Sequence, residues 1–184
     1  VKWLGHKSEH AGINLFAGFS ATELLVEDGR VVGVRTDDKG IDRNGNPKSN
    51  FQPGYNLRAK VVVLAEGVRG SLTKQLTNQF DLETGKNPQT YAIGVKELWE
   101  IPSGRLKAGE VVHTTGWPLS NQQFGGGFIY GLSDNEASLG LVAGLDYEDP
   151  RFDPQEALQQ FKTHPFIQKL LKGGQMIRYG AKAI

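Results

Sequence analysis

Residues 121–132 read NQQFGGGFIYGL, and three consecutive glycines interrupt a stretch that otherwise alternates like a β-strand. Glycine weakens a strand interior because it has no side chain to pack, so it marks a bulge or a close approach of another group to the backbone. Two interpretations of Gly125 and Gly126 follow. One is a bulge or tight strand crossing, and the other is a site where a planar or apolar ligand lies against exposed backbone.

The residues around this stretch predict a mostly antiparallel sheet. From residue 88 onward, turn signals separate strand-like runs, which are QTYAIGVKELWEI, GEVVHTTGW, FGGGFIYGL and ASLGLVAGLDY. A helix then begins with Asp153 as its N-cap and Pro154 at its first position. A second short helix begins at Pro165, and QMIRYGAKAI predicts a final strand that returns to another part of the molecule.

The first half of the chain has the pattern of part of an α/β unit. The run ATELLVEDGRVVGVRTDD predicts a hairpin, because Asp28-Gly29 suits a two-residue turn with positive φ. Residues 13–16 predict a short strand, and the apolar residues 61–64 predict a strand buried on both faces. Apolar residues at helical spacing follow this second strand.

Composition excludes several kinds of site. The chain has 184 residues and a net charge of +1, which argues against a nucleic-acid-binding surface. It contains no cysteine, so this chain cannot supply a cysteine nucleophile, a disulfide or the ligands of an iron–sulfur cluster. No apolar run is long enough to span a membrane. The first residue is Val1 rather than methionine, and we expect the chain to be a piece of a longer protein.

The run VVVLAEGVRG carries a second candidate site. A strand that ends at Ala65, Glu66 and Gly67 would place them at the carboxyl edge of an α/β sheet, where such sheets bind ligands. An ordinary strand, turn and helix is the alternative. No G-x-G-x-x-G occurs in the chain, so the fingerprint that binds a dinucleotide pyrophosphate is absent from it.

The ionisable residues show no hydrolytic or metal site. His6 and His10 are spaced i, i+4, but no glutamate stands in the H-E-x-x-H register, and a solvated helix face is the better interpretation. His113 lies in an expected strand and His164 precedes a proline, and neither has a catalytic partner nearby. We therefore predict no catalytic side chain and no metal ligand in this chain.

Taken together, these stretches resemble the electron-transfer flavoprotein–ubiquinone oxidoreductase family. The resemblance covers essentially the whole chain, in the family's order and spacing. The segments that carry it are VVVLAEGVRGSLTKQL, PQTYAIGVKELWEI, HTTGWPL, FGGGFIYGL, LGLVAGLDYEDP, HPFIQKLLKGG and IRYGAKAI. No single segment is specific, but their combination is.

The resemblance implies an oxidoreductase that, as a whole protein, holds FAD and one 4Fe-4S cluster. It implies electron transfer from reduced electron-transfer flavoprotein to ubiquinone, with the chemistry belonging to the cofactors. It also implies a peripheral protein on the bacterial inner membrane or the mitochondrial inner membrane, with no transmembrane helix and no nucleic-acid partner. This chain alone is expected to be inactive and to lack stoichiometric FAD.

A domain organisation follows from the same resemblance. Residues 1–84 correspond to the middle portion of an FAD-binding domain of the two-dinucleotide-binding type. Residues 85–150 correspond to a mostly antiparallel ubiquinone-binding domain, and residues 151–184 to helices and a strand that return to the FAD domain. The expected fold class is therefore α+β or α/β, with part of each domain present.

The resemblance also implies site residues. The family's paired glycines, which bond the quinone through backbone groups, match Gly125 and Gly126, and Phe124 and Phe128 are the apolar neighbours that hold the ring and tail. The family commonly has a tyrosine near its cluster at the position of Phe124, so this chain lacks that hydroxyl. The residues that match the family's second FAD-contact motif are Ala65, Glu66 and Gly67.

The sequence is also compatible with two other functions. Related flavoproteins, such as FAD-dependent hydroxylases and geranylgeranyl-reductase-like enzymes, share the strand–AEG–helix element but need no iron–sulfur domain. A non-catalytic lipid- or partner-binding module would instead use the aromatic and glycine-rich surface as an interaction patch.

Overall fold

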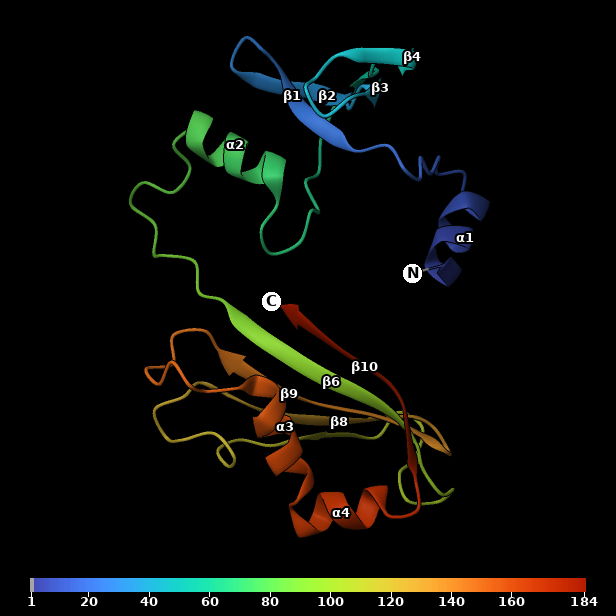
Figure 1. The fold of residues 1–184 in the computed structure, drawn as a ribbon, viewed down its shortest axis with the longest axis vertical. Coiled ribbons are helices and arrows are strands. Elements are labelled where there is room, and N and C mark those ends of the chain that lie inside the picture. The colour runs from blue at the N-terminus through green and yellow to red at the C-terminus, as the bar shows by residue number, and fades with distance from the viewer. Residues whose placement is uncertain (1) are drawn as a thin grey trace. The chain divides into compact units, whose positions relative to one another are not determined.

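The computed structural model describes residues 2–184, which fall into two compact units (Figure 1). The first unit ends at Lys86 and the second begins at Asn87. Both combine helices with antiparallel strands, which confirms the mixed fold class.

The first unit has its helices and short strands in the order α1, β1 to β5, α2. Their bounds are α1 Lys2–His10, β1 Ala21–Glu27, β2 Arg30–Thr36, β3 Lys39–Ile41, β4 Pro47–Gln52, β5 Asn56–Arg58 and α2 Ser71–Gln79. One sheet has the order β1-β2-β5, and β3 pairs with β4. The predicted hairpin is confirmed, since Asp28 and Gly29 turn between β1 and β2 with φ values of 49° and 72°.

Two strands expected in this unit do not form. Residues 13–16 are not in a strand, because the Ile13 amide bonds back to the end of α1 (N···O 3.0 Å). Residues 61–64 are also outside any strand, and Val61 and Val63 are 75% and 81% exposed. A buried strand needs hydrogen-bonding neighbours for its backbone, and no part of the chain that the structure describes pairs with this segment.

The second unit is built on a five-stranded sheet with the order β10-β6-β9-β8-β7. Its elements are β6 Ala92–Glu100, β7 Val111–His113, β8 Gly125–Ser133, β9 Glu136–Gly144, α3 Pro154–Lys162, α4 Pro165–Leu171 and β10 Gln175–Ala183. All neighbouring strands are antiparallel, as the sequence predicts.

The last strand belongs to this same sheet. β10 pairs with β6 from Gln175 opposite Glu100 to Ala183 opposite Ile93. Residues 151–184 therefore pack within the second unit, because the apolar face of α3 is buried on β6 and β9 and β10 pairs with β6. A return of the chain to the FAD-binding domain stays a prediction.

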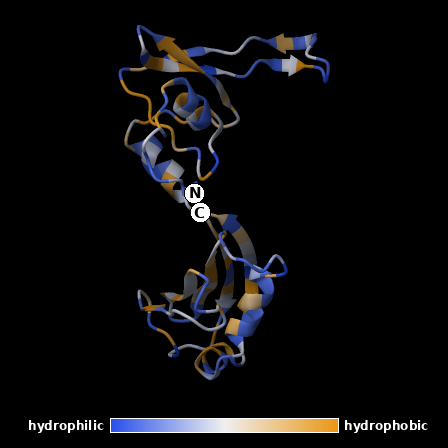
Figure 2. Ribbon diagram, turned by 90° about the vertical axis from the view of Figure 1, so that its left-hand side faces the viewer, coloured by the Kyte–Doolittle hydropathy of each residue, from blue (hydrophilic) through white to orange (hydrophobic). Residues whose placement is uncertain are grey.

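One face of the sheet is buried by α3 and α4. Asp153 caps α3 as predicted, since its carboxylate accepts hydrogen bonds from the Gln155 and Glu156 amides at 2.7 and 3.2 Å. Hydrophobic and hydrophilic residues both occur along these helices (Figure 2), and the hydrophobic ones meet the sheet. The buried core consists of Val95, Ile101, Leu106, Leu119, Ile129, Ala137, Leu139, Leu141, Ala143, Ala157, Leu158, Phe161, Ile167, Leu170 and Leu171.

A buried ion pair joins α3 to β6. Glu97 is 2% exposed, and Lys162 Nζ lies 2.9 and 2.8 Å from its two carboxylate oxygens. Trp99 Nε1 donates a hydrogen bond to the same carboxylate at 2.7 Å, and Gln159 donates one at 3.3 Å. The Lys162 ammonium also lies 5.3 Å from the Trp99 ring centre, which adds a cation–π contact. Burial of the pair is tolerated because both charges are matched and hydrogen-bonded.

Candidate functional site

Each of the three glycines at the start of β8 has a neighbour where a side chain would stand. A Cβ on Gly125 would lie 2.1 Å from the Val142 carbonyl oxygen, and one on Gly126 would lie 2.1 Å from the Thr114 carbonyl oxygen. The third glycine faces an aromatic ring of α3. These contacts support the interpretation as a tight strand crossing. Because the space beside each Cα is filled, a ligand could contact these glycines only through their backbone amides and carbonyls.

Gly125 is the glycine whose backbone groups have no strand partner. The Gly144 amide donates to the Phe124 carbonyl at 2.8 Å, which sets the alternation of hydrogen bonds between β8 and β9. By this alternation, the backbone amide and carbonyl of Gly126 face β9, whereas those of Gly125 face away from β9. On that other side of β8, strand β7 has already ended at His113 and offers Gly125 no partner. The part of the chain that the structure describes offers no hydrogen bond to the Gly125 amide or carbonyl.

The sheet face opposite α3 and α4 is not covered by any helix of residues 87–184 (Figure 1). Phe124 at its end is 76% exposed. Phe128 and Tyr130 stack with their ring centroids 4.9 Å apart, and a Cβ on Gly140 of β9 would lie 2.4 Å from the Phe128 ring. We call this surface the uncovered face, and it comprises Phe124, Gly126, Phe128, Tyr130, Val111, His113, Gly140 and Val142.

Ala65, Glu66 and Gly67 lie in an exposed segment without regular secondary structure before α2, rather than at the end of a strand. The Glu66 carboxylate accepts hydrogen bonds from the Leu72 amide at 3.1 Å and from the Thr73 amide and hydroxyl at 2.8 and 2.9 Å. These bonds, the Thr73 amide first, hold the pKa of Glu66 below its ordinary value. The amides at the start of α2 therefore already have an anionic partner, and a phosphate would compete with it.

Replacing Glu66 by glutamine is expected to lower the free energy of unfolding at neutral pH. The folded-state pKa lies below the ordinary 4.5, so the carboxylate's contribution is complete above pH 4.5 and is lost as the pH falls through the folded-state pKa. Urea unfolding of Glu66→Gln and wild type at a series of pH values should converge in acid. Glu23→Gln, at an exposed position of β1, is the control. A pH-independent difference would show that Glu66 acts only by packing.

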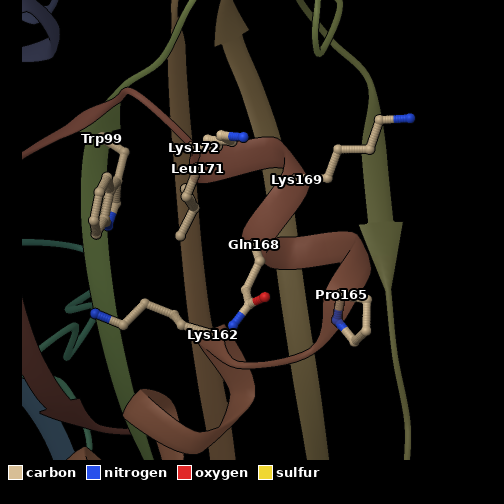
Figure 3. A pocket seen from close by; sticks show the side chains of 7 residues that line it. All are labelled: Trp99, Lys162, Pro165, Gln168, Lys169, Leu171 and Lys172. Atoms are coloured by element: carbon tan, nitrogen blue, oxygen red, sulfur yellow. The ribbon is translucent and has the colours of Figure 1, made fainter.

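A shallow pocket lies on the opposite side of the second unit, between β6, α3 and α4 (Figure 3). Lys162 extends from α3 toward the Trp99 ring on β6, and α4 contributes several of the remaining side chains. Lys162 is already matched by Glu97, which is 65 residues away in the sequence. Sequence spacing could not reveal this pocket, because it forms only when α3 packs on β6. Its lining residues are Trp99, Lys162, Pro165, Gln168, Lys169, Leu171 and Lys172.

His113 has a partner that the sequence did not show. Its Nε2 lies 3.2 Å from the Tyr130 hydroxyl oxygen, because β7 and β8 pair in a register that brings the two residues together. The sequence predicted no catalytic partner for His113, and this contact with the Tyr130 hydroxyl was not expected. A long connection separates the two strands, so their register could not be read from spacing.

The described residues contain no metal site. No group of three or more His, Asp and Glu side chains in residues 2–184 is placed to hold a metal ion. His6 lies 3.6 Å from Glu9 on the exposed helix α1, in keeping with a solvated face. None of the helices in this range is long and apolar enough to cross a membrane.

A protein-family model described as "ETF-QO, ubiquinone-binding" matches residues 91–184. The chain belongs to the electron transfer flavoprotein-ubiquinone oxidoreductase family. Curated ETF-QO relatives cover all of it: the probable enzymes of Schizosaccharomyces pombe and Acinetobacter baylyi are 45% and 46% identical, and the Homo sapiens enzyme is 46% identical. The chain spans 29%, 33% and 30% of the length of these three relatives.

Solved structures of more distant proteins share the fold of this ETF-QO chain. A geranylgeranyl bacteriochlorophyll reductase-like protein from Thermoplasma acidophilum matches all of the chain and 40% of its own, with a TM-score of 0.62 and 15% identity. A triple mutant of the flavin-dependent brominase Bmp2 matches all of the chain and 42% of its own, with a TM-score of 0.60 and 16% identity. At such identities the likeness concerns the fold alone, and the family assignment rests on the ETF-QO relatives.

Proposed function

We propose that this chain supplies the ubiquinone-binding surface of an oxidoreductase that passes electrons from reduced electron transfer flavoprotein to ubiquinone. The supporting observation is the unbonded backbone of Gly125 beside the exposed ring of Phe124, within residues that match a ubiquinone-binding family model. The Gly125 amide donates to one quinone carbonyl oxygen. Phe124 and Phe128 hold the ring and the apolar tail, and Gly126 lets the chain at Thr114 pass close to β8.

The residues of this chain could hold only part of the redox groups expected in the whole protein. FAD and a 4Fe-4S cluster, when bound, supply the one- and two-electron steps. The chain has no cysteine, so its residues do not fit cluster ligation. Glu66 accepts the amides at the start of α2, so this helix end does not fit the FAD pyrophosphate. This segment offers a flavin two exposed residues, Ala65 and Gly67, and a Cβ on Gly67 would have nothing within 4 Å.

We also propose that the whole protein is peripheral to a membrane, where ubiquinone resides. Relatives from Schizosaccharomyces pombe, Arabidopsis thaliana and Bos taurus are named mitochondrial, and one relative comes from the bacterium Acinetobacter baylyi. These names support the inner mitochondrial or the bacterial inner membrane. The ETF-QO relatives also favour a redox function over a non-catalytic lipid-binding module.

Replacing Phe124 by alanine in the whole protein is expected to reduce kcat/KM for a soluble ubiquinone analogue about tenfold. An aromatic contact is worth ~1.4 kcal/mol at the upper end of its usual range, which corresponds to that factor. Because Phe124 is 76% exposed in this chain, its removal should leave the melting temperature nearly unchanged. Phe166→Ala, at a half-exposed position on α4 across the sheet, is the control. Equal quinone kinetics in the two variants would argue against the proposed surface.

A further inference from the structure

The uncovered face carries a hydrogen-bonded pair of proton-bearing side chains, His113 and Tyr130. The imidazole Nε2 lies 3.2 Å from the phenol oxygen, and the two rings meet edge to face at 5.8 Å. Both residues lie on the same side of the sheet as Phe128, which is opposite His113 in the β7–β8 register and stacks on Tyr130.

The pair lies within reach of the proposed quinone position. In the β7–β8 register, the place opposite Gly125 is three residues beyond His113, roughly 10 Å at about 3.3 Å per residue. A quinone ring whose first oxygen accepts a hydrogen bond from Gly125 spans much of this distance toward His113. One water molecule can bridge the remaining gap between the second quinone oxygen and the His113 ring. His113 is itself exposed, so bulk water can return a proton to its ring.

Most other ionisable side chains on this sheet face lie toward its opposite edge. Asp146 is the exception, because its Oδ1 would lie 2.6 Å from a Cβ on Gly144, beside Phe124. Lys96 and Glu100 belong to β6, and Arg178 and Lys182 belong to β10, on the far side of β9 from the pair. Glu136 is at the far end of β9 from Gly125. Apart from Tyr130, β8 has no ionisable side chain, so His113 is the basic group that faces the aromatic end of the sheet.

Reduction of a quinone to a quinol takes up two electrons and two protons, and a positioned side chain can supply a proton at the moment of transfer. We propose that His113 donates one of these protons to the ubiquinone oxygen and that Tyr130 is the residue that positions its ring. This inference rests on the proposed quinone surface.

The proton and electron balance is complete. Two electrons come from reduced electron transfer flavoprotein through the redox groups of the whole protein. The imidazolium Nδ1–H bond of His113 breaks and one quinol O–H bond forms, directly or through a water, while the second proton comes from solvent. Nε2 keeps its proton, which it donates to the Tyr130 oxygen, and this bond fixes the tautomer that remains. Water then reprotonates Nδ1.

The test uses the whole protein, reduced beforehand and mixed rapidly with a soluble ubiquinone analogue. His113→Gln should slow quinol formation on the order of a hundredfold, in the range of a lost general acid. Added imidazole should restore part of this rate. Reduction of ferricyanide, which takes up no proton, should be unchanged. Tyr130→Phe should slow quinol formation by a smaller factor, and His10→Gln on exposed α1 should match wild type.

Two results would overturn the inference. Quinol formation in His113→Gln at the wild-type rate would exclude a proton-donor role, and equal losses with quinone and ferricyanide, without imidazole rescue, would assign His113 a structural role. Calorimetry of the same analogue on the wild-type protein separates these results from failure of the proposed function. If the analogue binds to wild type but His113→Gln forms quinol at the wild-type rate, only the proton-donor role is excluded. If the analogue does not bind to wild type, both the quinone surface and this inference are excluded.

Discussion

Replacing Lys162 by methionine is expected to lower the free energy of unfolding by about 3–5 kcal/mol, the usual cost of leaving one charge of a buried pair without its partner. Glu97 is 2% exposed, and its carboxylate would keep only the hydrogen bonds from Trp99 and Gln159. Chemical denaturation followed by tryptophan fluorescence measures the loss, because Trp99 lies in the cluster.

Two further variants separate the buried charge from simple loss of a side chain. Glu97→Leu combined with Lys162→Met removes both charges, and it should recover a large part of the lost stability. Lys169→Met, on the neighbouring helix α4, should stay within about 0.5 kcal/mol of wild type. If Lys162→Met were as stable as Lys169→Met, the ion pair would have no role in holding α3 on the sheet.

Replacing Gly126 by alanine is expected to destabilise the second unit by about 1–3 kcal/mol or more, in the range of overpacked interiors. The added Cβ would lie 2.1 Å from the Thr114 carbonyl oxygen, and this atom is backbone that accepts a hydrogen bond from Gly127. A bulkier valine at the same position would therefore disturb the sheet as well as any bound quinone. For this reason Phe124 is the cleaner probe of the ligand surface.

Gly180 supplies the matched control for this substitution. It also lies in a strand of the same sheet, β10, but a Cβ there has nothing within 4 Å. Gly180→Ala should be neutral or stabilising by a few tenths of a kcal/mol, because it restricts the unfolded chain. Thermal unfolding of both variants gives the comparison. Equal melting temperatures would mean that the strand crossing at Gly126 yields without cost.

Local chemistry allowed much of the fold to be predicted from the sequence. Asp28-Gly29 specifies its turn by needing positive φ, and Asp153 with Pro154 specifies a helix start, so both were correct without tertiary information. The antiparallel sheet followed from alternating runs separated by turns. Residues 61–64 show the limit of this approach, since apolar composition cannot reveal whether a neighbouring strand is present to pair with them.

Only the part of the candidate site that lies within one short sequence motif could be predicted from the sequence. The glycines of β8 were visible as a motif, but their neighbours Val142 and Thr114 depend on strand register. The contact between His113 and Tyr130 depends on the same register. The position of Glu66 at a cofactor stays a prediction. The hydrogen bonds from the start of α2 to its carboxylate depend on the path of the backbone, which the sequence does not show.

Photoaffinity labelling with an azido-ubiquinone analogue tests the quinone surface most directly. The whole protein would be irradiated with the analogue, digested, and the labelled peptides mapped by mass spectrometry. We expect label on the uncovered face, in the segment from Phe124 to Tyr130, and we expect unlabelled ubiquinone to compete for it. Label that concentrates instead on the pocket formed by Trp99 and α4, across the sheet, would contradict the assignment of quinone binding to the Gly125 side.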